Sequence, residues 1–254
     1  MIAKENVNGQ YQYLKAYLFT DYKQALDTLG KQYNVKFIYN VDDTFIDNSL
    51  VGQGLQNTAT PISNYELARY SVLLPRLFSK YPQEVIKKEL KIIKLSATLI
   101  LYGVSYGGTS IDSVLYLTSA GIDNGYTDLY IKELFNHEFS SILMRNHHFP
   151  ENEFVKNNPP QFHYAQNTDE ILRSITQDKN STGNEALYKN GFLTKYSMST
   201  LENDLNMFAE HIFTKPHLLH HLINTYPRLN NKYLVVKEFY LGINPEFKKI
   251  FNTI

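Results

Sequence analysis

The spacing of apolar residues predicts that helices and short strands alternate in the first half of the chain. Helical periodicity predicts helices at Tyr22–Tyr33, Tyr65–Lys80 and Pro82–Lys91, and β-branched apolar runs predict strands at Val35–Tyr39, Ile92–Tyr102 and Ser113–Thr118. Ser63 or Asn64 can cap the second helix, and Pro75 is expected to kink or break it. Residues 48–63 and the Gly/Ser segment 103–112 are expected to form loops.

The second half of the chain has mainly helical spacing. A helix is predicted at Leu129–Asn146, capped by Thr127 or Asp128. A polar excursion follows from His147 to Gly191, with at most one short helix near Asp169–Ile175. Four more helices are predicted at Leu201–Phe213, Pro216–Thr225, Leu229–Leu241 and Pro245–Phe251. We therefore predict one α+β domain over 1–254, with a helix and strand part at 1–126 and a mainly helical part at 127–254.

Composition and charge narrow the classes of function. The 254 residues carry 25 Lys+Arg and 25 Asp+Glu, so the chain lacks the excess positive charge of a nucleic-acid-binding protein. No apolar run is long enough to span a bilayer, and the first residues are too polar for a signal peptide, although export cannot be judged from this alone. With no Cys, the available strong metal ligands are His, Asp and Glu.

The segment from His137 to Ser141 carries the clearest chemical signal. It reads His-Glu-Phe-Ser-Ser and begins like the zinc motif H-E-x-x-H, in which two His residues on one helical face bind the metal and the Glu activates its water. His137 is therefore a candidate zinc ligand, and Glu138 is a candidate general base. The fifth position holds Ser141, whose neutral hydroxyl is a poor zinc ligand.

A second segment strengthens this signal. Some 55–60 residues downstream, the chain reads Gly-Phe-Leu-Thr-Lys-Tyr at Gly191–Tyr196 and then has an acidic helix start at Glu202–Asp204. Together with His137–Phe139, these features resemble the motifs of lethal-factor-like and related gluzincin-type bacterial zinc metallopeptidases. The resemblance covers about residues 85–215.

The resemblance implies a zincin-like α+β fold with a small mixed sheet, an active-site helix and a helical C-terminal part. It implies zinc as the cofactor and a peptide or protein as the partner. It also implies that Ser113–Thr118 lies at the sheet edge beside the active-site helix, where an extended peptide can pair with it. It implies that Tyr196 donates a hydrogen bond to the oxyanion, and that Glu202 is the acidic residue nearest the third-ligand position. It also suggests an exported or lipid-anchored bacterial protein.

The sequence departs from the pattern at the ligand positions. Counting from Tyr196 places Asn203 at the third-ligand position, and aligning on Phe208–Glu210 places Asn206 there instead. Glu202 is one residue early, which is a rotation of about 100° on a helix. The motif is therefore degenerate. We predict a weakly active or inactive metallopeptidase-like protein that binds a peptide or glycopeptide in its cleft.

Two alternatives stay open at this point. One is an active zinc metallohydrolase in which His137 is joined by relocated ligands such as Glu202, Asp204 or His147. The other is a non-enzymatic interaction or glycan-binding module with a Tyr-rich surface. Oligomeric state is not indicated.

Other candidate ligands have simpler interpretations. His147 has the spacing of a third metzincin ligand, with Met198 as a possible Met-turn, but Met144 stands where that motif needs Gly. The His residues of Pro216–Thr225, which are His217, His220 and His221, are expected on a solvated or packed helix face. Glu210 and His211 are expected to be polar residues on a helix surface.

Overall fold

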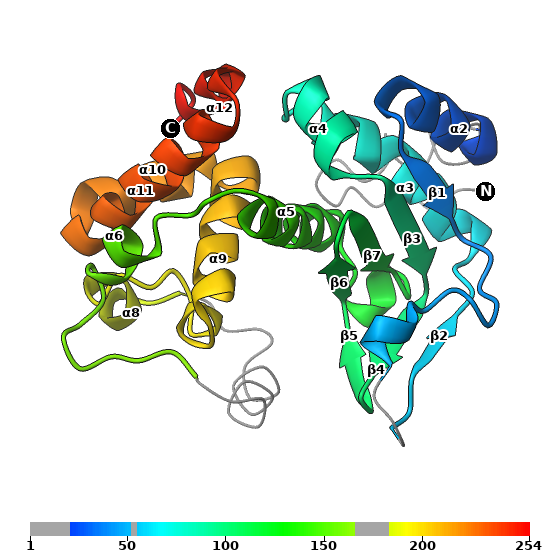
Figure 1. The fold of residues 1–254 in the computed structure, drawn as a ribbon, viewed down its shortest axis with the longest axis horizontal. Coiled ribbons are helices and arrows are strands. Elements are labelled where there is room, and N and C mark those ends of the chain that lie inside the picture. Colours follow the sequence, from blue (N-terminus) through cyan, green and yellow to red (C-terminus); the bar gives the residue numbers. More distant parts are fainter. Residues whose placement is uncertain (1–20, 52–54, 166–182) are drawn as a thin grey trace, which may run out of the picture. The chain divides into compact units, whose positions relative to one another are not determined.

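The computed structural model describes residues 21–51, 55–165 and 183–254. The chain forms two compact units, residues 1–131 (unit 1) and residues 132–254 (unit 2). Strands lie in unit 1, whereas the described part of unit 2 is built from helices, so the chain as a whole is α+β (Figure 1). None of the described helices is both long and apolar enough to cross a membrane.

The main sheet of unit 1 has four strands in the order β1-β3-β7-β6. β1 (Lys36–Ile38), β3 (Ile92–Ser96) and β7 (Val114–Thr118) run parallel, and β6 (Gly108–Ile111) pairs antiparallel with β7. The expectation that Ser113–Thr118 lies at the sheet edge is wrong, because β7 lies between β3 and β6. The turn between β6 and β7 includes Asp112 in the left-handed region, with φ 48°.

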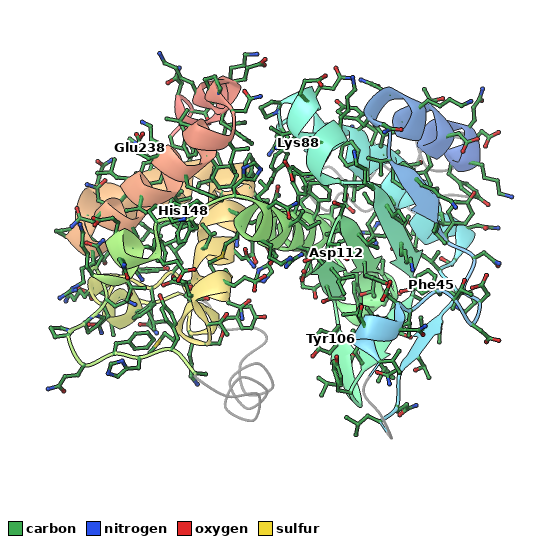
Figure 2. The ribbon with its side chains drawn as sticks, in the orientation of Figure 1. Phe45, Lys88, Tyr106, Asp112, His148 and Glu238 are labelled. Carbon is green, nitrogen blue, oxygen red and sulfur yellow. The ribbon has the colours of Figure 1, made fainter. Side chains whose placement is uncertain are left out.

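A second sheet contains β2 (Thr58–Thr60), β4 (Thr98–Leu101) and β5 (Val104–Tyr106) in that order. The apolar run that predicted one strand at Ile92–Tyr102 therefore supplies two strands of different sheets, β3 and β4. Tyr102 and Gly103 both have positive φ, as a tight β4–β5 hairpin turn requires. Apolar side chains of β4 pack with Tyr116 of β7 and with Phe45, which is labelled in Figure 2.

A buried lysine organises the loop around Phe45. Lys94 of β3 lies directly opposite Tyr116 of β7 in the sheet. Its Nζ donates to the Phe45 carbonyl at 2.6 Å and to the Tyr116 hydroxyl at 3.1 Å. The same ammonium lies 5.0 Å from the centre of the Tyr116 ring. The Phe45 carbonyl, the Tyr116 hydroxyl and the Tyr116 ring therefore partner this cation.

The described part of unit 1 also contains the α-helices α2 (Tyr22–Tyr33), α3 (Asn64–Phe78) and α4 (Gln83–Glu89), the short 3-10 helices η1 (Asn48–Leu50) and η2 (Ile122–Asn124), and the first turn of α5 (Asp128–Asn146). The predicted helix at Tyr22–Tyr33 is confirmed, and it buries Leu26, Leu29 and Tyr33. Ser63 caps α3, because its side chain accepts from the Glu66 amide. Pro75 lies inside α3 without ending it, and its side chain is exposed.

Unit 2 is a helical cluster with an aromatic core. Its longer helices are α5 (Asp128–Asn146, from residue 132 onward), α9 (Leu201–Thr214), α10 (Pro216–Thr225) and α11 (Pro227–Ile243), and its shorter helical segments are α6 (Glu151–Val155), α8 (Glu185–Lys189), η3 (Tyr196–Met198), η4 (Pro245–Phe247) and α12 (Lys248–Phe251). Residues 147–191, expected to be largely irregular, contain α6 and α8, and the helix expected at 169–175 lies outside the described residues. Phe208, Phe213 and Tyr240 are among the fully buried side chains.

A buried ion pair joins α9 to α11. Lys232 Nζ donates to Asp204 Oδ2 at 2.6 Å, and both side chains are inaccessible to solvent. The Tyr164 hydroxyl donates to the same Asp204 oxygen at 2.6 Å. The ammonium also lies over the rings of Phe154 and Phe192. Asp204 Oδ2 is thus engaged by two donors within unit 2, whereas Asp204 Oδ1 is buried without a hydrogen-bond partner among the described residues.

Candidate functional site

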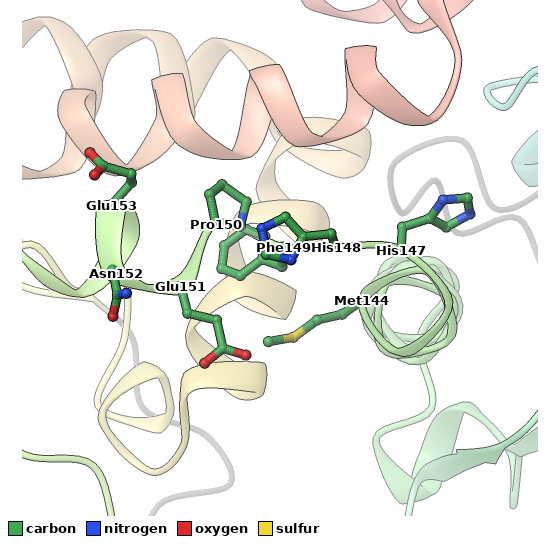
Figure 3. A pocket seen from close by; sticks show the side chains of 8 residues that line it. All are labelled: Met144, His147, His148, Phe149, Pro150, Glu151, Asn152 and Glu153. Atoms are coloured by element: carbon green, nitrogen blue, oxygen red, sulfur yellow. The ribbon is translucent and has the colours of Figure 1, made fainter.

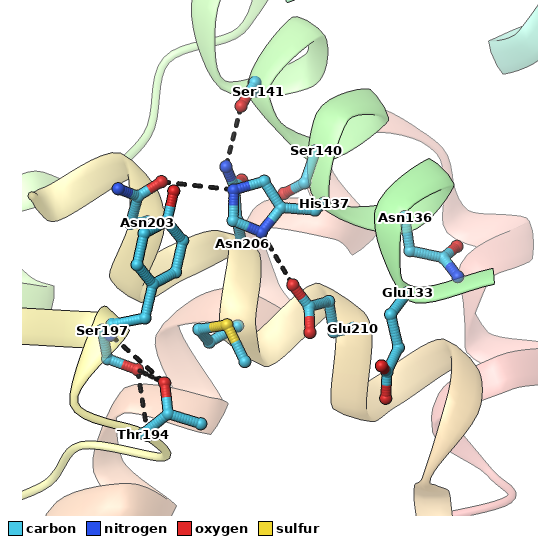
Figure 4. A network of polar contacts seen from close by, with 12 residues as sticks. Glu133, Asn136, His137, Ser140, Ser141, Thr194, Ser197, Asn203, Asn206 and Glu210 are labelled. Carbon is cyan, nitrogen blue, oxygen red and sulfur yellow. Dashed lines mark hydrogen bonds and ion pairs between the residues drawn. The ribbon is translucent and has the colours of Figure 1, made fainter. Parts of the chain in front are cut away.

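The candidate site lies between α5 and α9. His137 and Ser141 are four residues apart on α5, so they share one face of the helix, as their spacing predicts. Asn203, Asn206 and Glu210 of α9 contact this face (Figure 4). All five side chains are largely buried, and Asn206 is fully inaccessible to solvent. Phe139 of α5 and Phe208 of α9 are themselves inaccessible to solvent.

Both ring nitrogens of His137 have protein partners. Nδ1 lies 2.7 Å from Glu210 Oε1, and Nε2 lies 3.2 Å from Asn203 Oδ1. A metal-binding His characteristically has one nitrogen held by a carboxylate, and Glu210 supplies that contact here. The other nitrogen, which would face a metal, is instead directed at an amide oxygen.

The hydrogen bonds that continue from Asn203 determine where the protons lie. Asn203 Nδ2 donates to Ser199 Oγ at 2.8 Å, and Ser199 Oγ donates to the Tyr196 carbonyl at 2.7 Å. A carbonyl oxygen only accepts, so the chain of bonds runs from Asn203 towards Tyr196, and the Asn203 oxygen must face His137. His137 Nε2 therefore carries a hydrogen and donates it to Asn203.

The charges around His137 favour the same protonation state. Burial alone lowers the pKa of His137, but the hydrogen bond and charge of Glu210, the charge of Glu138 and the hydrogen bond to Asn203 together raise it to about 9. Burial raises the pKa of Glu210, and the His137 charge opposes that rise. At neutral pH we therefore describe a buried imidazolium–carboxylate pair in which both N–H groups of His137 donate.

Ser141 and Asn206 form the second contact between the two helices. Asn206 Nδ2 donates to Ser141 Oγ at 2.7 Å. Within the described residues, the Asn206 Oδ1 atom is buried without a hydrogen-bond partner. A buried carbonyl oxygen of this kind normally finds a donor, and Asp204 Oδ1, two residues earlier on α9, is likewise without one among the described residues.

Of the residues predicted for catalysis, Tyr196 and Glu138 are both near His137. The Tyr196 ring centre lies 5.7 Å from that of His137 with 35° between the ring planes. Glu138 is half-buried and close enough for its charge to raise the pKa of His137. Their roles as oxyanion donor and general base stay predictions.

Glu202, the predicted third ligand, contacts a different residue. Its carboxylate lies 3.3 Å from Arg145 Nη1 in an exposed ion pair. Asn203, the next residue, contacts His137 instead, as a rotation of about 100° between neighbouring helix positions requires. Asn203, and not Glu202, is therefore the residue at this end of α9 that contacts the His137 ring.

The residues between α5 and α9 do not fit a zinc ion. Zinc sites use three or four lone-pair donors, chiefly His, Asp, Glu or Cys. His137 has both nitrogens engaged as donors, and the facing positions hold Ser141, Asn203 and Asn206. Throughout residues 21–51, 55–165 and 183–254, no three His, Cys, Asp or Glu side chains gather as a metal site.

The other candidate ligands lie elsewhere. α5 continues to Asn146, so the metzincin-type turn at Met144 is not formed. His147 lines an open pocket of about 500 Å³ formed by Met144 and residues 147–153 (Figure 3). Of the solvated or packed helix face expected for His217, His220 and His221, the structure shows the solvated one, because all three are exposed on α10. No set of ligands converges on His137 from these positions.

The surface placement expected for Glu210 and His211 is wrong. Glu210 faces His137 with only 12% of its side chain exposed, and His211 is buried with Nδ1 2.8 Å from the Met207 carbonyl. The sequence did contain a signal for Glu210. Aligning the chain on Phe208–Glu210 matches Glu210 to the last Glu of the family's E-D-F-A-E helix and Asn206 to the first, one helical turn earlier. The structure supports this alignment through the Asn206 contact to Ser141.

Comparisons with known proteins bear on the fold. No protein-family model matches the chain, and no curated protein matches it. Among solved structures, the chain is similar to a candidate zinc-binding metallopeptidase from Bacteroides caccae ATCC 43185, with a TM-score of 0.52 and 16% sequence identity. The similarity covers 94% of this chain and 88% of that one. The chain therefore has a metallopeptidase-like α+β fold.

Proposed function

We propose that this protein keeps a metallopeptidase-like fold but recognises a polypeptide without zinc-dependent hydrolysis. The observation that carries the proposal is the pair of hydrogen bonds from His137 to Glu210 and Asn203. A peptidase of this class needs a lone pair on that imidazole and further ligands beside it. The likeness to a candidate metallopeptidase supports a polypeptide as the class of ligand.

Metal content tests the first half of the proposal. The untagged chain is freed of metal, incubated with equimolar zinc, and assayed for bound metal as wild type, His137→Ala and His217→Ala/His221→Ala. The last variant removes exposed α10 histidines that can bind zinc adventitiously. We expect no stoichiometric zinc that depends on His137. Zinc that disappears in His137→Ala but persists in the α10 variant would overturn the proposal.

Hydrolysis is tested in the same preparations. Fluorescein-labelled casein is incubated with wild type and Glu138→Gln, with and without added zinc. Because Glu138 is the predicted base, an active peptidase loses cleavage in this variant while its shape is nearly kept. We expect equal background signals from both proteins. Zinc-stimulated cleavage that Glu138→Gln abolishes would establish the active alternative.

Polypeptide binding is tested with a chain that cannot fold. Reduced, carboxymethylated α-lactalbumin carrying a fluorophore is titrated with the protein, and native α-lactalbumin is the matched control. We expect saturable binding of the unfolded form that a zinc chelator leaves unchanged. Tyr196→Ala should weaken it, whereas Tyr65→Ala, at an exposed tyrosine of unit 1, should not. Equal binding of folded and unfolded probes, or none, contradicts a polypeptide-recognition function.

The cellular location is also a proposal. The resemblance to secreted or surface-anchored metallopeptidases supports an exported or lipid-anchored bacterial protein. Fractionation of cells producing the natural protein, followed by immunodetection, tests this directly. Detection confined to the cytoplasm contradicts it.

A further inference from the structure

Ser141 and Asn206 meet at the centre of the contact between α5 and α9. We infer that these two residues occupy the positions from which metal ligands are missing, and that their hydrogen bond now makes the helix-to-helix link that a metal ion would make. The inference rests on the proposed absence of zinc, and it adds which positions are responsible and what replaced their function.

The position of Ser141 follows from α5. Ser141 lies one helical turn after His137 on the same buried face, and its Oγ is directed at α9. A ligand at this position would therefore approach the same space as His137 Nε2. Serine is too short and too weak a donor to complete a zinc site there.

The choice of Asn206 over Asn203 follows from their partners. Asn203 uses both ends of its amide, with its oxygen on His137 and its nitrogen on Ser199. Asn206 uses only its nitrogen, and its buried Oδ1 faces no donor among the residues that the structure describes. A buried acceptor oxygen that lacks a donor keeps its lone pairs for a cation, which is what a ligand position requires.

The spacing along the two helices supports the same assignment. On α5, His137 and Ser141 are four residues apart, and on α9, Asn206 and Glu210 are also four residues apart. The earlier residue on α5, His137, contacts the later residue on α9, Glu210, and Ser141 contacts Asn206. The two helices therefore run antiparallel at this contact, with both pairs in register. Glu210 is thus a positioning residue that would already orient His137 for a metal.

The experiment is to supply the missing ligands. Ser141→His/Asn206→Glu is compared with wild type and with Ser141→His/Asn203→Glu for zinc stoichiometry and for melting temperature with and without zinc. We expect one zinc per chain and a zinc-dependent rise in melting temperature only in the Asn206 variant. Adding His137→Ala to that variant should abolish both.

A second variant keeps the test decisive if histidine overpacks position 141. Ser141→Asp/Asn206→Asp adds little volume, and Asn206→Asp is nearly isosteric. Its two facing carboxylates should make folding depend on zinc. Folded protein without zinc binding in both designs, or binding through position 203, overturns the assignment. Zinc bound to wild type through His137 instead overturns the proposed function, so the two failures are distinguishable.

Discussion

The imidazolium state of His137 makes the stability of unit 2 depend on alkaline pH. His137 has a folded-state pKa of about 9 against 6.5 for an ordinary His, because Glu210 and Asn203 both accept from its ring. A raised His pKa contributes stability that is complete below pH 6.5 and is lost as pH rises through about 9. The difference corresponds to about 3 kcal/mol in the free energy of unfolding.

The measurement compares wild type with His137→Gln, which cannot titrate in this range. Urea unfolding is followed by far-UV circular dichroism between pH 6 and pH 10, and the transition of unit 2 is analysed separately if the two units unfold apart. We expect the stability advantage of wild type over the variant to shrink by about 3 kcal/mol across this window. Groups that titrate identically in both proteins cancel in the difference.

Two further variants show whether Glu210 causes the effect. Glu210→Gln removes the charge that holds the proton on His137, so its pH dependence should resemble that of His137→Gln. Glu202→Gln removes a carboxylate of α9 that pairs with Arg145 instead, at 3.3 Å, and should keep the wild-type slope. A difference between wild type and His137→Gln that stays constant from pH 6 to pH 10 would refute the imidazolium assignment, and with it the direction of the hydrogen bonds.

Three other predictions follow from buried polar groups. Lys232→Met should destabilise unit 2 by about 3–5 kcal/mol in urea unfolding because it leaves buried Asp204 unpaired, and Lys232→Met/Asp204→Leu should recover part of that loss. Burial lowers the pKa of His211 to about 4, so we expect about 3 kcal/mol of stability to be lost as pH falls from 6.5 to 4, and this loss should be absent in His211→Gln. Lys94→Met should lower the free energy of unfolding by about 1–3 kcal/mol. It should also speed hydrogen exchange at the Asp47 amide, because that N–H donates to Tyr116 beside Lys94. Unchanged exchange would contradict the role of Lys94 in ordering that loop.

Much of the helical architecture could be predicted from the sequence, because its helices carry their own signals. α2 has the predicted bounds, since its apolar spacing and its Asp21 cap are both local. The four-residue spacing of His137 and Ser141 likewise predicted that they share a face. The count from Tyr196 to Asn203 anticipated the residue that meets His137, because a short helical segment leads directly into α9.

The sheets were harder to predict for a physical reason. β5 and β6 have three and four residues, and both lie in a segment whose Gly and Ser content indicates a turn. Such short strands depend on pairing with β4 and β7 more than on their own side chains. The break of the run Ile92–Tyr102 at Ala97 likewise depends on β2, which pairs with β4 from a segment expected to be a loop.

Glu210 shows the same limitation at the candidate site. Its neighbours in sequence are typical of a helix whose charged residues face solvent, so local pattern assigns it to the surface. Its burial depends on the imidazole of His137, 73 residues earlier in the chain. A partner at that separation leaves no trace in local periodicity.

The hydrogen bonds that run from His137 to the Tyr196 carbonyl also determine how fast the ring hydrogens of His137 exchange with water. In this series His137 Nε2 donates to Asn203, Asn203 Nδ2 donates to Ser199, and Ser199 donates to a peptide oxygen that has no hydrogen to offer in return. Because about a tenth of each side chain of His137 and Glu210 is exposed, we expect the Nδ1 and Nε2 hydrogens of His137 to leave chiefly when α5 and α9 separate enough to admit more water. In a nuclear magnetic resonance spectrum they should persist as slowly exchanging downfield signals, and their lifetimes should report how often unit 2 opens at this contact.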